Sequence, residues 1–311
     1  MNYNVLNKMG GVTPYAKTKA TFFKALLPFM IMLHHYSQKT DFVSVFKYLG
    51  IPIVACFFLM SGYGLMTSYL KKGSAYMEHF LLHRFKAVLI PYLVTLLFCV
   101  VYKTIKNDID IWQYFSDKPF EQFVPHTWFV WVLVGGYVIF KVIFSSKIDI
   151  RQKIALFALC SLCYYIIGIL SGLPKFWYFS SPAMLLGMIW RYKENAIMKF
   201  IDGHICLFPV LPILVSAIPM LLFHVKNFFP ISACLFFMWF AYLCREGWCN
   251  NKITKFLGGI SYEVYLCHGI LVGIMVGLSN SDTLNFILLI IATVIFSVLV
   301  NKVSNLIKRV L

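Results

Sequence analysis

Charged residues are scarce in this chain. Asp, Glu, Lys and Arg make up 13% of its 311 residues, against about a quarter in a soluble domain. Hydrophobic residues make up 60%, and the mean hydropathy is +0.77. These values exclude an ordinary soluble domain and predict an all-α membrane protein, because a helix satisfies its own backbone hydrogen bonds inside a lipid bilayer.

Acidic residues are the scarcest charged group, with 12 against 28 Lys and Arg, so the formal net charge is +16. The basic residues lie between apolar runs and form no stripe, which argues against a nucleic-acid partner. The nine cysteines show no metal-ligand spacing. Cys160 and Cys163 lie within an apolar segment, where buried thiols are ordinary packing, so no metal site is expected.

Other signals are also missing from the sequence. No secretory signal is visible at the N-terminus, so the first helix is expected to remain in the mature protein.

The apolar runs predict about ten transmembrane helices in a single membrane domain covering residues 1–311. Their expected ranges are roughly 21–36, 46–70, 87–102, 127–144, 154–171, 176–190, 205–223, 227–244, 258–278 and 284–306.

The distribution of basic residues predicts the orientation. With the N-terminus in the cytoplasm and ten spans, 21 of the 28 Lys and Arg residues fall on the cytoplasmic side. Such an excess is typical of cytoplasmic loops, so both termini are predicted to be cytoplasmic. The longest outer connection, about 102–126, is expected to recognise a hydrophilic acceptor. It carries Asp108, Asp110, Trp112, Asp117, Glu121 and His126.

The first apolar segment, 21–36, carries a lysine near its start and two histidines near its end. Lys24 and His35 are eleven residues apart, which places them on one helix face about 16 Å apart along the axis, whereas His34 points elsewhere. A titratable imidazole near the middle of a bilayer is costly and therefore suggests a site. The structural alternative is a lysine that extends to the interface and a histidine satisfied by neighbouring helices.

Two further segments place polar side chains beside the predicted spans. In 55–64, small residues allow close helix packing, and Ser61 and Tyr63 are the candidates for lining a narrow substrate path. In 83–92, Arg84 and Lys86 end a cytoplasmic loop. They are either the basic flank of a span or a phosphate contact, for which the guanidinium fork of arginine is suited.

Two more candidate regions contain histidine. At 125–129, His126 and Trp128 are either interfacial anchors or sugar contacts. In 258–268, Ser261, Tyr265 and His268 share one helix face. Glu263 lies about 160° from His268 on the same helix and close to the cytoplasmic end, so it is expected to be solvated rather than catalytic.

Taken together and in order, these pieces resemble the acyltransferase 3 family of bacterial integral-membrane acyltransferases, which modify cell-surface polysaccharides and related sugars. The resemblance extends over about residues 20–270, and the ten-helix count agrees with it. The matching pieces are Lys24-Ala25 with His35 after nine residues, FFLMSGY at 57–63, RFK at 84–86 leading to IPY at 90–92, HTWF at 126–129 and ISYEVYLCH at 260–268.

This resemblance implies the transfer of an acyl group, usually acetyl, from cytoplasmic acyl-CoA to a sugar hydroxyl at the bacterial cytoplasmic (inner) membrane. It makes His35 the catalytic residue and Lys24, Arg84 and Lys86 the donor-binding residues. Lys24 and Ala87 both stand where the family has arginine. The remaining substrate-binding candidates are Ser61, Tyr63, His126, Trp128, Tyr265 and His268. A transporter or flippase for an acyl, sugar or lipid-linked saccharide substrate is the alternative.

Overall fold

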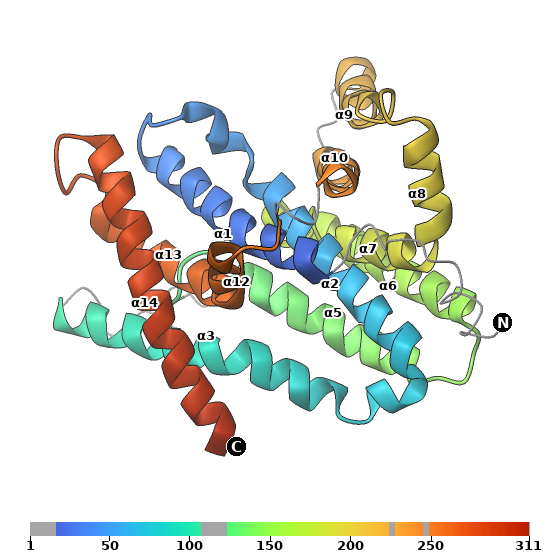
Figure 1. Ribbon diagram of the computed structural model, residues 1–311, viewed down its shortest axis with the longest axis horizontal. Coiled ribbons are helices and arrows are strands. Elements are labelled where there is room, and N and C mark those ends of the chain that lie inside the picture. Colours follow the sequence, from blue (N-terminus) through green and yellow to red (C-terminus); the bar gives the residue numbers. More distant parts are fainter. Residues whose placement is uncertain (1–16, 107–122, 224–227, 245–248, 311) are drawn as a thin grey trace.

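The computed structural model describes residues 17–106, 123–223, 228–244 and 249–310, and these parts are helical with no strand. Figure 1 shows the arrangement of the helices. The first six α-helices described are α1 (Lys17–Lys39), α2 (Gly50–Lys72), α3 (Phe80–Ile105), α5 (Trp128–Phe144), α6 (Ile150–Leu170) and α7 (Ala183–Tyr192). They are followed by α8 (Glu194–Gly203), α9 (Val210–Phe223), α10 (Phe229–Leu243), α12 (Lys252–Gly259), α13 (Ser261–Met275) and α14 (Asp282–Val310). Short 3₁₀ turns are η2 (Ser44–Tyr48), η3 (Gly73–Met77) and η4 (Lys175–Trp177).

Helix α2 lies at the centre of one group of helices, with α7 and α10 packed along it. Two glycines allow α2 and α7 to approach. A Cβ atom on Gly62 would lie 1.8 Å from the carbonyl oxygen of Met184, and one on Gly187 would lie 1.9 Å from that of Leu59. No larger residue fits at either position without moving the backbone, so the small residues of the second apolar segment determine this crossing.

Helix α1 connects this group to a second one formed by α3, α12, α13 and α14. It contacts α2 on one side and both α12 and α13 on another, while α13 packs against α14 and α3. In Figure 1, α8, α9 and α10 lie together on one side of the molecule, away from α3 and α14. Candidate residues on α1 therefore lie between the α2 and α13 groups.

The outer surface is apolar, as lipid contact requires. Leu170 on α6, Ile213 on α9 and Ile295 on α14 are 80%, 63% and 66% exposed, respectively. Helices α3, α6 and α14, together with Gly50–Met77, are long and apolar enough to cross a bilayer. The α12–α13 pair would form a fifth span. The chain is therefore a multi-pass membrane protein, and the count of ten spans remains a prediction.

Most helices differ by several residues from their expected ranges; α3, for example, begins at Phe80 rather than 87, and α8 was not expected. Three differences are informative. Helix α6 begins at Ile150 rather than 154, because Asp149 and Gln152 form a capping box at its start. The segment 176–190 gives only the ten-residue α7, about 15 Å long and too short to span alone. The expected helix 258–278 is broken into α12 and α13, which meet at an angle of 66°.

Candidate functional site

Three imidazole rings from three parts of the chain lie together with nearly parallel planes. His35 is on α1, His126 lies just before α5, and His268 is on α13. The ring centroids of His35 and His126 are 3.6 Å apart and those of His35 and His268 are 5.3 Å apart, with interplanar angles of 17° and 24°. The centroids of His126 and His268 are 6.0 Å apart, so the three rings form a compact triangle in which His35 is the nearest neighbour of each of the other two, and we call this group the histidine stack.

The side chain of Gln38 determines which nitrogen of His35 is free to act as a base. The Nδ1 atom of His35 lies 3.1 Å from the Gln38 carbonyl oxygen Oε1, which only accepts hydrogen bonds. Nδ1 therefore carries the hydrogen and donates it, which leaves a lone pair on Nε2. A neutral imidazole in this tautomer is able to accept a proton from a hydroxyl group.

His34 has a packing role. Its Nδ1 donates to the carbonyl oxygen of Phe46 at 2.8 Å. Its ring also lies against the start of α2, where a Cβ atom on Gly50 would approach Nε2 to 2.3 Å. The two adjacent histidines therefore have different partners.

His126 adopts a left-handed backbone conformation, with φ of +65°. Such strain in a non-glycine residue is sustained only by surrounding contacts. The Tyr265 hydroxyl donates to the His126 carbonyl oxygen at 2.7 Å. Gly269 lets α13 pass close by, since a Cβ atom there would lie 2.7 Å from the Pro125 carbonyl oxygen. Gly269 was not singled out from the sequence, although its place directly after His268 was a signal.

His268 is fully buried, and its Nδ1 donates to the carbonyl oxygen of Tyr265. Its Nε2 has no hydrogen-bond partner within the described residues. Glu263, on the opposite face of α13, was expected to be solvated, but this is wrong. Its side chain is only 4% exposed and accepts a hydrogen bond from the Asn301 amide at 2.9 Å, because α14 covers this face of α13.

A cavity of about 630 Å³ lies between α1, α2, α3, α5 and α13. Four of its lining residues are cationic: Lys17, Lys24, Lys71 and Arg84. Two of them, Lys24 and Arg84, were candidates from the sequence, and Lys17 and Lys71 were missed. Lys17 lies seven residues before Lys24, which places both on one face of α1 and was a usable signal. We call this space the cationic cavity.

Arg84 is fixed in the wall of the cationic cavity. Its Nη2 donates to the Tyr76 hydroxyl at 2.6 Å, and its guanidinium carbon lies 5.4 Å from the centroid of the Tyr137 ring. Of the other candidates in this part of α3, Lys86 is not among the residues that line the cavity, and Ala87 is exposed.

Ser61 and Tyr63 line the same cavity and bond to different helices. The Ser61 hydroxyl is 3.1 Å from that of Tyr137, and the Tyr63 hydroxyl donates to Oε1 of Glu194 at 2.7 Å. The other oxygen of Glu194 pairs with Arg191 at 3.0 Å. Burial raises the pKa of the Glu194 carboxyl, and the Tyr63 and Arg191 contacts oppose that shift. Tyr63 is therefore held by a buried ionic pair beyond the cavity wall.

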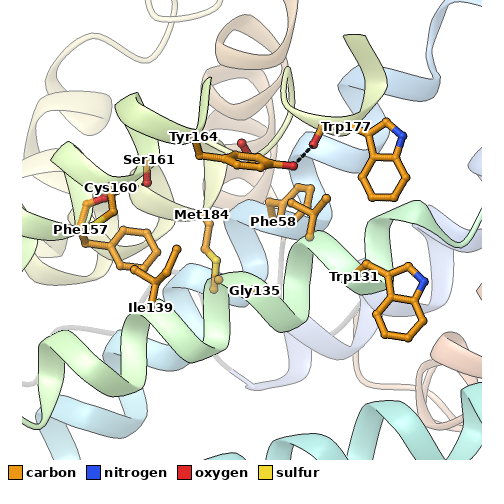
Figure 2. A pocket seen from close by; sticks show the side chains of 13 residues that line it. Phe58, Trp131, Gly135, Ile139, Phe157, Cys160, Ser161, Tyr164, Trp177 and Met184 are labelled. Atoms are coloured by element: carbon orange, nitrogen blue, oxygen red, sulfur yellow. Dashed lines mark hydrogen bonds between the residues drawn. The ribbon is translucent and has the colours of Figure 1, made fainter. Parts of the chain in front are cut away.

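Trp128 lies apart from the histidine stack. Its ring is 5.5 Å from that of Phe176 and 6.4 Å from that of Trp177, measured between centroids. Nearby, a smaller and mostly apolar cavity of about 200 Å³ lies between α5, α6 and α7 (Figure 2). Cys160 lines this second cavity, while Cys163 is exposed rather than buried.

The sequence also predicted that no metal site is present and that the connection 102–126 recognises an acceptor. No group of three or more His, Cys, Asp or Glu suited to hold a metal ion occurs in the described ranges. The expected acceptor-binding residues Asp108, Asp110, Trp112, Asp117 and Glu121 lie outside the described residues.

Comparison with known proteins gives one match. A family model described as an acyltransferase domain, that of the acyltransferase 3 family, matches residues 20–302. The searches of curated proteins and of solved structures gave no match. The matched range includes three of the four cavity cations, Lys24, Lys71 and Arg84, and all three members of the histidine stack.

Proposed function

Because the chain belongs to the acyltransferase 3 family, we propose that it transfers an acetyl group from cytoplasmic acetyl-CoA to a sugar hydroxyl of an exopolysaccharide or another cell-surface glycan. Its place is then the cytoplasmic membrane of a bacterium. The observation that carries the proposal is the arrangement of the site. A cationic cavity suited to phosphate groups lies next to a stack of histidines in which His35 has a free Nε2 lone pair.

The donor end of this proposal rests on charge. Coenzyme A carries several phosphate groups, and Lys17, Lys24, Lys71 and Arg84 converge on one cavity without an acidic residue among its lining side chains. Lysine and arginine are the usual phosphate-binding residues. All four fall on the side of the membrane that the positive-inside pattern assigns to the cytoplasm, where acyl-CoA is available.

The chemical step uses His35 as the general base. The acceptor hydroxyl oxygen attacks the thioester carbonyl carbon while Nε2 of His35 takes the hydroxyl proton. The carbon–sulfur bond then breaks and the proton passes to the leaving sulfur, so the products are a sugar ester and the free thiol of coenzyme A. Gln38 holds the imidazole in the required tautomer throughout.

The experiment is to replace His35 with alanine and to measure acetyl transfer from labelled acetyl-CoA to the glycans of the host membrane. His35→Ala is expected to abolish transfer, because it removes the proposed general base. His204→Ala, at the exposed end of α8, is the matched control and should transfer normally. Transfer by His35→Ala, with normal membrane insertion, would overturn the proposal. Glycan movement without thiol release would support a transporter instead.

A further inference from the structure

The cationic cavity and the histidine stack are adjacent but not continuous. None of the three imidazoles is among the residues that line the cavity. Tyr265 lines the cavity and also contacts the histidine stack. Its ring lines the cavity, its hydroxyl bonds to the backbone of His126, and its centroid is 5.5 Å from that of His268. Tyr265 therefore lies between the cavity and the histidine stack.

Tyr265 is one of three aromatic rings that close this end of the cavity. Phe57 on α2, Phe129 on α5 and Tyr265 on α13 all line the cavity and contact one another in pairs. The centroid distances are 5.9 Å for Phe57–Phe129, 5.9 Å for Phe57–Tyr265 and 5.4 Å for Phe129–Tyr265. These are the separations of packed aromatic pairs. We call these three residues the aromatic triangle.

Lys71 lies at the opposite end of the cavity from the aromatic triangle, and Arg84 is also separated from the triangle along α5. Along α2, the lining residues extend from Phe57 to Lys71, fourteen residues or about 21 Å. Along α5, they extend from Phe129 to Tyr137, and Tyr137 is the residue that contacts Arg84. A donor whose phosphates bind the cations therefore directs its acyl end toward the aromatic triangle.

We propose that the aromatic triangle selects the donor by the length of its acyl chain, accepting acetyl and rejecting chains of about six carbons. This rests on the proposed function, because it assumes an acyl-CoA donor. Phe129 cannot easily move aside, since it is 5% exposed and Phe58 packs behind it at 4.7 Å. Tyr265 is likewise buried and held by its bond to His126. A long chain has to displace packed rings, whereas two carbons occupy little space.

Phe57 is the ring to change, because it is only half-buried and its substitution leaves the other two in place. Membrane vesicles with the protein and the host's own glycans receive labelled acetyl-, butanoyl- or hexanoyl-CoA, with His35→Ala vesicles as background. The measured quantity is the ratio of hexanoyl to acetyl transfer. Phe57→Leu and Phe57→Ala should raise this ratio about tenfold or more, and Phe57→Trp should lower it. A ratio measured within one sample does not depend on how much protein has folded.

Leu133→Ala is the matched control. Leu133 lines the same cavity one helical turn from Phe129 but lies outside the triangle, so the substitution enlarges the cavity and should leave the ratio unchanged. An unchanged ratio in Phe57→Ala, or an equal rise in Leu133→Ala, overturns the selection by the aromatic triangle while acetyl transfer stands. If the unmodified chain transfers no acyl group from any of the three donors, the proposed function fails as well.

Discussion

At the scale of single residues, the site depends on which neighbours each polar side chain meets. His34 and His35 are adjacent in sequence, yet the His34 ring bonds to a backbone carbonyl, whereas the His35 ring lies against both His126 and His268. Lys71 and Lys72 differ in the same way, because only Lys71 lines the cationic cavity. Helix geometry explains both pairs, since neighbouring residues point about 100° apart.

The two lysines provide a residue-scale prediction. Lys71→Ala should raise the KM for acetyl-CoA about tenfold, with a smaller effect on kcat, because a charged contact to a phosphate is lost. The difference from the unmodified chain should shrink at high salt, which screens such contacts. Initial rates over a range of acetyl-CoA concentrations provide the measurement. Lys72→Ala is the control, and an equal effect there would contradict a specific role of Lys71.

At the scale of helices, the segment Ser61-Gly62-Tyr63-Gly64 combines packing with binding. The two glycines are not equivalent: a Cβ atom on Gly62 would meet the backbone of α7, whereas one on Gly64 has nothing within 4 Å. Ser61 and Tyr63 direct their hydroxyls to α5 and α8. The close approach of α7 to α2 thus determines where one wall of the cationic cavity stands.

Gly62→Ala should therefore destabilise the protein by about 3 kcal/mol, since overpacking against a rigid backbone is costly. Gly64→Ala should leave stability unchanged or slightly raised, because alanine favours a helix more than glycine does. Thermal unfolding in detergent distinguishes the two variants. Equal melting temperatures for both would show that the α2–α7 crossing tolerates an added methyl group.

At the scale of the whole molecule, the basic residues assigned to the cytoplasm converge in space. Lys17, Lys24, Lys71 and Arg84 come from three separate helices, yet they line a single cavity. The histidine stack lies farther along α1, past Pro28. The site therefore extends along α1 from its expected cytoplasmic end, as transfer between a cytoplasmic donor and an outer acceptor would require.

The expected orientation is open to a direct test. An epitope inserted at Asn280, in the exposed turn between α13 and α14, should be reached by antibody when the outer envelope is opened and the cytoplasmic membrane is left intact. Epitopes at Ser146, between α5 and α6, or after Leu311 should be reached only when the cytoplasmic membrane is permeabilised. Antibody binding to the C-terminal epitope from outside would contradict the prediction that both termini are cytoplasmic.

The sequence alone determined the membrane class and the approximate positions of the helices, because composition and periodicity are properties of neighbouring residues. Its motifs resembled the family that the family model then showed, and they predicted Lys24, His35 and Arg84 as site residues. The tertiary structure decided what depends on contacts between distant segments. Such contacts produced the stack of His35 with His126 and His268, the convergence of Lys17 and Lys71 on the cavity, and the burial of Glu263 under α14. They also closed the cavity with Phe57, Phe129 and Tyr265, because three helices far apart in the chain must pack before those rings can meet.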